Sequence, residues 1–216
     1  MHCTKFLLDF DALQHNSCHV WDGQFGRNHF EARTLFNMHK TLRKLWMGDL
    51  AAQRAHLKRL DPEARRLRFG GVTSDEFIDA YVDTAFRLDA TIFAVFIDGE
   101  IRGSAELRSI FGGATQDAEA AFAVEAGWQD RGLGSELMDR ILTTAQNRGI
   151  GRLHMICLSE NARMRHIAGK FGARLTFAEG EVSGEVSPPA PTPMSLLDEF
   201  VHDAQDFVTA AFDWRR

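Results

Sequence analysis

The 216-residue sequence predicts a single α+β domain of three layers, in which a mixed, mostly antiparallel sheet carries helices on both faces. Three observations predict this fold. Apolar stretches rich in β-branched and aromatic residues meet at a hairpin signal near the middle of the chain. Amphipathic segments with the period of a helix precede them. In the second half, strand-like and helix-like segments alternate.

The expected elements follow from capping and turn signals. Asp49 has the position of an N-cap, and Thr73 and Glu76 have the spacing of a capping box. Asp98-Gly99 is a strong hairpin signal. In order, we expect a strand at 41–46, helices at 49–60 and 75–87, strands at 91–97 and 100–110, a turn at Gly112-Gly113, a strand at 118–125, a helix at 132–148, a strand at 152–159, a helix ending at Gly172, and two short strands within 173–187.

The two ends of the chain differ from the predicted domain at 39–187. Residues 1–38 show no sustained period and predict an irregular arm, and the spacing of their histidines and cysteines matches no usual zinc pattern. The proline-rich stretch 188–193 is typical of a stiff linker. Residues 194–216 predict an acidic amphipathic helix, for which docking on the basic region 40–68 is one hypothesis. Its expected apolar face consists of Leu197, Phe200, Phe207, Ala211 and Trp214.

The composition excludes several classes of protein. Lys and Arg number 25 against 30 Asp and Glu, a net charge of −5, whereas nucleic-acid-binding proteins usually have a basic face. The longest apolar run, 92–97, is far shorter than the ~20 residues of a membrane-spanning helix. The first residues lack the apolar core of a secretory signal, and three widely spaced cysteines imply no disulfide framework. We therefore expect a cytoplasmic protein that binds neither nucleic acid nor membrane.

The segment 122–135 contains the most specific chemical signal. A predicted strand runs directly into a glycine-containing turn, and the turn opens a long helix. The first N–H groups of a helix lack intrahelical partners and lie at the positive end of its dipole, so such a turn can bind a pyrophosphate. Gly132 and Gly134 let the backbone approach the phosphate without an intervening Cβ.

Two common nucleotide-binding motifs do not fit this turn. A Rossmann fingerprint needs G-x-G-x-x-G after the first strand, whereas these glycines lie after antiparallel strands. A Walker loop needs a Lys after its last glycine, and here Ser135 and Glu136 follow. The pattern that remains is Gln-x-x-Gly-x-Gly at 129–134. It resembles the acetyl-CoA pyrophosphate motif of the GNAT N-acetyltransferase superfamily.

The surrounding sequence strengthens this resemblance, which covers 117–175 closely and 40–180 loosely. The segment 118–124 and the pair Trp128-Gln129 are most similar to the acetyltransferase domain of bacterial protein-lysine acetyltransferases. The resemblance implies a GNAT-like fold, acetyl-CoA as the acyl donor, no metal, and direct attack of an amine on the thioester.

The resemblance also implies which residues bind the donor. The strand is expected to splay near Val124, whose N–H would face the thioester carbonyl and stabilise the oxyanion. Asn161 would hydrogen-bond the pantetheine arm, act as an ordinary N-cap, or do both. The expected donor-binding set is Val124, Gln129, Asp130, Arg131, Gly132, Leu133, Gly134, Ser135 and Asn161.

Three glutamates are candidates for the general base, which is needed because a lysine-like ammonium has a reference pKa of about 10.4. Glu119 matches the glutamate proposed as base in the lysine-acetylating branch; the alternative is a solvent-facing strand carboxylate. Glu125 shares its strand face by the period of two, and Glu106 lies on the neighbouring strand, so either could be the base or an anchor for the amine. The usual general-acid tyrosine is absent, because Ala168 occupies its position and Tyr81 is the only tyrosine.

The leading interpretation is therefore an acetyl-CoA-dependent N-acyltransferase acting on a primary amine, with a protein lysine as one acceptor. The same chemistry on a polyamine, an antibiotic or an amino acid stays open, because the donor motif is shared while acceptor pockets diverge. A non-catalytic acyl-CoA-binding regulator is the alternative of another class. The acceptor, the acyl chain length and the oligomeric state, a homodimer included, are not set by the sequence.

Overall fold

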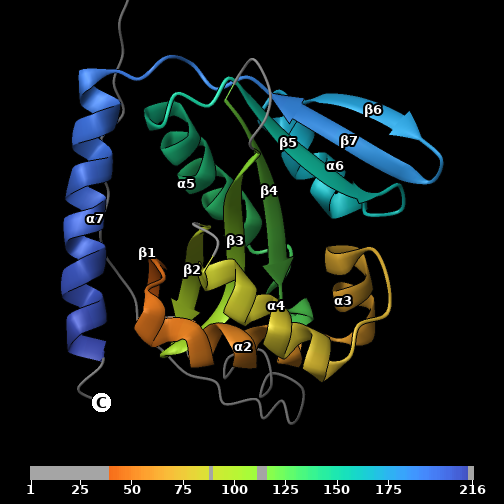
Figure 1. Ribbon diagram of the computed structural model, residues 1–216, viewed down its shortest axis with the longest axis horizontal. Helices are drawn as coiled ribbons and strands as arrows, with labels where there is room; N and C mark the ends of the chain where they lie inside the picture. The colour runs from red at the N-terminus through yellow and green to blue at the C-terminus, as the bar shows by residue number, and fades with distance from the viewer. Residues whose placement is uncertain (1–38, 88–89, 111–115, 214–216) are drawn as a thin grey trace, which may run out of the picture. The chain divides into compact units, whose positions relative to one another are not determined.

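A seven-stranded sheet organises the computed structural model of this chain (Figure 1). The structure describes residues 39–87, 90–110 and 116–213; the predicted N-terminal arm, the turn at Gly112-Gly113 and Trp214 lie outside them. The strands are β1 (Lys40–Lys44), β2 (Thr91–Ile97), β3 (Glu100–Ile110), β4 (Asp117–Val124), β5 (Arg152–Leu158), β6 (Arg174–Ala178) and β7 (Glu181–Val186). Their order in the sheet is β1-β2-β3-β4-β5-β7-β6, and β4 with β5 is the one parallel pair among them. The predicted mixed, mostly antiparallel sheet is confirmed.

Helices cover both faces of the sheet, as predicted (Figure 1). They are α2 (Leu50–Arg59), α3 (Pro62–Phe69), α4 (Asp75–Arg87), α5 (Leu133–Asn147), α6 (Ala162–Lys170) and α7 (Pro193–Asp213), with single 3-10 turns η1 (Met47–Asp49) and η2 (Ala126–Trp128). None of the described helices is both long and apolar enough to cross a membrane.

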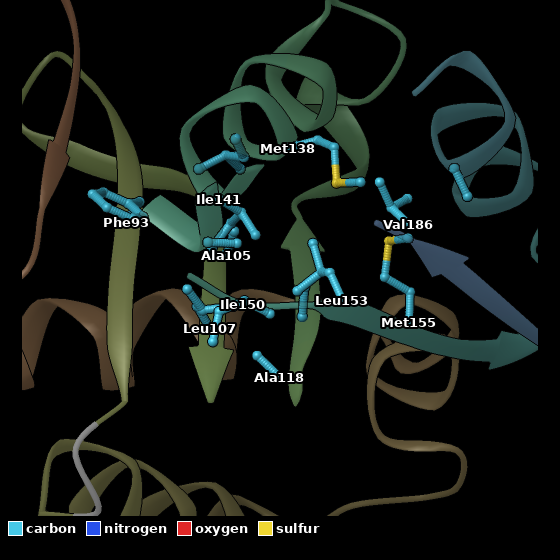
Figure 2. Close-up of a cluster of buried hydrophobic side chains, with 14 of the residues drawn as sticks. Phe93, Ala105, Leu107, Ala118, Met138, Ile141, Ile150, Leu153, Met155 and Val186 are labelled. Carbon is cyan, nitrogen blue, oxygen red and sulfur yellow. The ribbon is translucent and has the colours of Figure 1, made fainter. Parts of the chain in front are cut away.

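The alternation of side chains along β2 explains why this strand is apolar from Ile92 to Ile97. Phe93 points toward α5 and packs in the cluster that includes Ile141 (Figure 2). Ile92 and Ala94 point to the opposite face and pack with Ala85 of α4. Because both faces are covered, all seven residues of the strand are buried.

The hairpin between β2 and β3 forms at Asp98-Gly99, as the sequence predicts. Both residues have a positive φ, 52° and 83°, which suits a two-residue turn whose twist matches that of the flanking strands. Together with one bulge at Val95/Phe96, the turn sets a register that places Glu106 opposite Ile92.

Two predicted helix caps differ in detail from the structure. Asp49 precedes α2, but its carboxylate binds the buried guanidinium of Arg43 at 2.8 Å instead of capping the helix. A buried cation requires a partner, and this requirement outweighs the cap. At α4, the hydroxyl of Ser74, rather than that of Thr73, accepts the N–H of Phe77 at 3.2 Å.

The C-terminal helix α7 lies beside β1 and α5 (Figure 1). The carboxylate of Asp206 accepts the backbone N–H of Lys44 at 2.9 Å and pairs with Arg140 at 2.6 Å. The acidic helix thus touches the basic region 40–68 at β1, as hypothesised, and also contacts α5. Most of its expected apolar face does not pack on the domain. Leu197, Phe200 and Ala211 are exposed, and Phe207 is 64% exposed although its ring meets that of Trp46 edge to face, 6.4 Å between centroids.

Candidate active site

Strands β4 and β5 separate after a short parallel stretch. Residues 117–119 of β4 pair with 152–154 of β5, and beyond this point β4 continues along β3 while β5 continues along β7. The splay begins at Ala120, earlier than the predicted position near Val124. One edge of β4 is therefore left open beside the first turn of α5.

A cleft of about 550 Å³ lies at this opening. Its walls are the end of β4, the turn 128–132, the first turn of α5 and the start of α6, with α3 on the remaining side. Eight of the nine predicted donor-binding residues line it, namely Val124, Gln129, Asp130, Gly132, Leu133, Gly134, Ser135 and Asn161. Arg131 is not part of the lining, and its guanidinium lies over the ring of Trp128, 4.9 Å from the centroid.

The turn between β4 and α5 is shaped to leave the helix start open. Gly132 has a φ of 86°, a left-handed conformation in which any residue with a side chain would be strained. As the N-cap residue it also provides no side-chain hydrogen bond to the start of α5. A Cβ on Gly134 would lie 2.6 Å from Cδ1 of Ile167, so glycine permits close approach of α6. The N–H of Ser135 donates to the carbonyl of Gly132 at 3.0 Å, whereas those of Leu133 and Gly134, two residues of the cleft lining, have no capping side chain.

The end of β4 directs the backbone of Val124 toward the same cleft. The N–H of Glu125 donates to the carbonyl of Arg102 at 3.0 Å, on the β3 side. Because successive N–H groups of a strand point to opposite edges, the N–H of Val124 points to the open edge. The Nε2 of Gln129 donates to the carbonyl of Val124 at 3.0 Å and fixes this peptide.

Glu125 is held in a buried ionic cluster behind the end of β4. Its Oε1 lies 3.0 Å from Nδ1 of His56 and 3.0 Å from Nε of Arg59, and its Oε2 lies 2.9 Å from Nη1 of Arg102. Burial raises the pKa of Glu125, but the hydrogen bonds from His56 and Arg102 and the nearby charges outweigh burial and hold the pKa at about 2. A carboxylate with this pKa is a weak base at neutral pH.

His56 gives this cluster a testable pH dependence. Burial lowers the pKa of His56 despite its bond to Glu125, so the folded state resists the proton that the unfolded state takes up below pH 6.5. The free energy of unfolding should therefore fall as the pH falls from 6.5, by about 1 kcal/mol per pH unit from this residue. Urea denaturation at pH 7.5, 6.5 and 5.5 measures the slope.

Substitution of His56 tests whether this residue causes the pH dependence of the free energy of unfolding. His56→Gln keeps an amide donor for Glu125 but does not titrate, so this variant should show a shallower pH dependence, whatever its absolute stability. The matched control is His202→Gln, at an exposed position on α7, which should leave the slope unchanged. Equal slopes in wild type and His56→Gln would contradict the prediction.

Glu106 is buried on β3 in a second polar cluster. It accepts hydrogen bonds from the hydroxyl of Tyr81 and the guanidinium of Arg108, and Nη2 of Arg68 lies 3.3 Å from its Oε2. Burial raises the pKa of Tyr81 to about 12, so the phenol stays protonated and donates a hydrogen bond to Glu106. Of this cluster, Arg68 lines the cleft.

Glu119 has a different environment from the other two glutamates. It is exposed on β4, opposite Arg108 of β3. The strand register places Glu119, Glu106 and Glu125 on one face of the sheet, the face that α2 and α4 cover farther along. None of the three lines the cleft itself.

The structure also identifies cleft residues that the sequence analysis missed. Arg163, at the start of α6, lines the cleft and pairs with Asp130 at 3.1 Å, joining the turn to α6. Its position two residues after Asn161 was the available signal. The side chain of Asn161 itself caps α6 by accepting the N–H of Met164 at 3.0 Å. Among the described residues, no group of three or more His, Cys, Asp or Glu could hold a metal ion.

Comparisons with known proteins agree with this geometry. The family model described as "Acetyltransferase (GNAT) family" matches residues 55–173, more than half of the chain. Acetyltransferase Pat of Mycolicibacterium smegmatis is 32% identical over 90 residues, which are 41% of this chain and 27% of that protein. The match thus spans about a quarter of the length of this curated relative.

Solved structures show the same fold. The GNAT domain of S. lividans PAT superposes with a TM-score of 0.59 at 24% identity, covering 68% of this chain and 89% of that chain. For yncA of Salmonella typhimurium, solved with its cofactor acetyl-CoA, the TM-score is 0.54 at 19% identity, covering 71% of this chain and 98% of that chain. These comparisons confirm the fold that the motif resemblance predicted, and they agree with acetyl-CoA as the donor used by this family. The chain belongs to the GNAT family of acetyltransferases.

Proposed function

We propose that this protein is an N-acetyltransferase of the cytoplasm that transfers the acetyl group of acetyl-CoA to the side-chain amine of a protein lysine. The observation that carries the proposal is the cleft at the splay of β4 and β5, which collects eight of the nine predicted donor-binding residues. The uncapped start of α5 supplies N–H groups for the pyrophosphate. The open edge of β4 supplies backbone groups for the amide-bearing arm of the donor.

The chain's own residues can perform the transfer. The N–H of Val124 points into the cleft, where it would stabilise the negative charge that develops on the thioester oxygen. Glu119 is the residue we assign as general base, taking a proton from the acceptor ammonium directly or through water. A thiol is acidic enough, with a reference pKa of about 8.5 for cysteine, that the donor can leave as a thiolate without a general acid. This explains why Ala168 can occupy the usual tyrosine position.

The environment of the acidic residues favours a protein lysine over a polyamine. A deep pocket lined by free carboxylates would favour a polyamine. Glu106 is engaged by Tyr81, Arg68 and Arg108, and Glu125 by arginine and histidine side chains. Glu119, by contrast, is exposed to approach from solvent. A flexible lysine on another protein can reach such a carboxylate.

Release of the free thiol, followed with lysine-bearing peptides and with spermidine, tests the proposal. We expect turnover with lysine peptides and a kcat/KM for spermidine at least about 10-fold lower, which is a difference of 1.4 kcal/mol in transition-state binding. A peptide with the lysine replaced by arginine is the control. Turnover with small amines alone would assign a small-molecule acceptor. Donor binding without turnover on any amine would instead indicate the regulatory alternative.

Arg163 should contribute to donor binding. A guanidinium held by Asp130 at the edge of the cleft can exchange this partner for a phosphate oxygen. Because the side chain is exposed, we expect Arg163→Gln to raise the Kd for acetyl-CoA by only about 3- to 10-fold, and by less in 0.5 M salt. Calorimetry measures both. Arg174→Gln, at an exposed position on β6 outside the cleft lining, should leave the Kd unchanged; an equal effect of the two substitutions would refute a local role.

A further inference from the structure

Helix α7 presents its polar side to the domain and most of its apolar side to solvent; at one edge of the apolar side, the ring of Phe207 also meets Trp46. Asn147 of α5 donates to Glu199, and Asp206 binds Arg140 and the backbone of Lys44. No described residue of α7 belongs to a buried hydrophobic cluster. Seven large apolar side chains of this helix are between 44% and 71% exposed, namely Met194, Leu196, Leu197, Phe200, Val201, Phe207 and Val208.

The exposed area is that of an interface. With side-chain areas of about 150–250 Å² for the largest of them, these seven residues expose on the order of 700 Å². The largest apolar patch of a typical monomer is about 300–600 Å². A standard protein–protein interface buries about 800 Å² on each partner. The patch on α7 is therefore large enough to form the centre of a stable dimer.

The spacing of the exposed residues is that of a helix-pairing seam. Leu197, Phe200, Ala204, Phe207 and Ala211 follow one another at intervals of three, four, three and four residues. This is the interval that keeps a seam facing a partner helix. All five are exposed on α7, and none is charged, so a second copy of the seam can cover them without burying a charge.

We propose that the chain forms a homodimer in which α7 packs antiparallel against α7 of a second copy, about a two-fold axis near Ala204. Ala204 lies near the middle of Pro193–Asp213. An axis there places Leu197 opposite the partner's Ala211 and Phe200 opposite the partner's Val208, so that large residues meet small ones. A parallel pair would instead stack phenylalanine on phenylalanine at both position 200 and position 207. The antiparallel pair also opposes the two helix dipoles favourably.

Charge argues against a membrane as the occupant of this face. Residues 193–213 contain five acidic residues and no Lys or Arg. Anionic lipid surfaces attract helices with basic flanks and repel acidic ones. Several of these carboxylates, Asp206 among them, are already engaged by the domain, so they do not oppose a second copy.

The solution mass of the full chain tests the proposal. Light scattering after size exclusion should give about twice the chain mass of 24.3 kDa for the wild type, and the chain mass for Phe200→Glu with Val208→Glu. Circular dichroism and acetyl-CoA binding should be unchanged in that variant. Phe177→Glu is the matched control, because Phe177 is 60% exposed on β6, and it should remain dimeric. A monomeric wild type at 100 μM, or a dimeric double variant, would overturn the proposal.

Cysteine cross-linking tests the antiparallel arrangement, in a background with Cys3→Ser and Cys18→Ser. Ala204→Cys should form an intermolecular disulfide with itself under mild oxidation. Leu197→Cys should not, because the two copies of position 197 lie about 21 Å apart along antiparallel helices. It should cross-link when mixed with Ala211→Cys. Efficient self-linking of Leu197→Cys would overturn the antiparallel arrangement, as would failure of Ala204→Cys in a dimer.

Discussion

Gly134→Glu should lower the affinity for acetyl-CoA by at least about 100-fold, which is about 2.7 kcal/mol. Gly134 lies in the first turn of α5 and lines the cleft. A glutamate there places a negative charge where we propose that the pyrophosphate binds, and its side chain fills the cleft. The N–H groups that would otherwise contact phosphate are then opposed by a carboxylate. Calorimetric titration of the folded variant measures the change.

Two controls separate this effect from misfolding and from general charge. Gly134→Ala requires only Cδ1 of Ile167, the end of a flexible side chain, to move. It should fold and retain binding within about tenfold. Gly127→Glu adds the same charge seven residues earlier, at an exposed position with no atom within 4 Å of its Cβ, and should bind normally. Undiminished binding by folded Gly134→Glu would place the donor elsewhere and remove the basis of the proposed function.

Glu119→Gln should lower kcat by about 10²- to 10⁴-fold while leaving the Kd for acetyl-CoA within twofold. The amide keeps the size and exposure of the side chain but does not accept the proton. Because the free amine becomes more abundant as the pH approaches the lysine pKa of about 10.4, the loss should shrink between pH 7.5 and 9.5. A merely structural role would show no such recovery. Initial rates at saturating lysine peptide measure both effects.

The comparison with other carboxylates completes this test. Glu181→Gln, at an exposed position on β7, is the matched control and should retain wild-type kcat. Glu125→Gln removes the carboxylate that pairs with two arginines and a histidine in the buried cluster. The free energy of unfolding should therefore fall together with any loss of kcat. If Glu119→Gln keeps full activity, the base is another group, and Glu106 becomes the next residue to test.

Features governed by neighbouring residues could be predicted from the sequence. The Asp98-Gly99 hairpin depends on two backbone conformations, which the residue types themselves favour. The donor turn likewise depends on spacing within a few residues, and Gln129, Gly132 and Gly134 line one cleft as expected. Local errors arose where a distant partner competed, as when Arg43 engaged Asp49 and left α2 without its predicted cap.

The distinction among the three glutamates required long-range contacts. From the sequence, the resemblance favoured Glu119, but all three remained candidate bases on neighbouring strands. Glu125 meets His56 and Arg59 only because α2 crosses the end of β4, 69 and 66 residues away along the chain. Its low pKa is a consequence of that packing. No local pattern contains such a contact.

The sequence by itself thus determined the mixed sheet, through periodicity and turn chemistry, and the resemblance to the GNAT family, through a motif spaced within one segment. The tertiary structure decided which carboxylates are paired, where Arg163 lies, and which way α7 faces. An amphipathic pattern states that a helix has an apolar side, but not what that side meets. Here Asp206 of α7 binds Arg140 and the backbone of Lys44 on the domain, and these contacts leave most of the apolar side of the helix exposed.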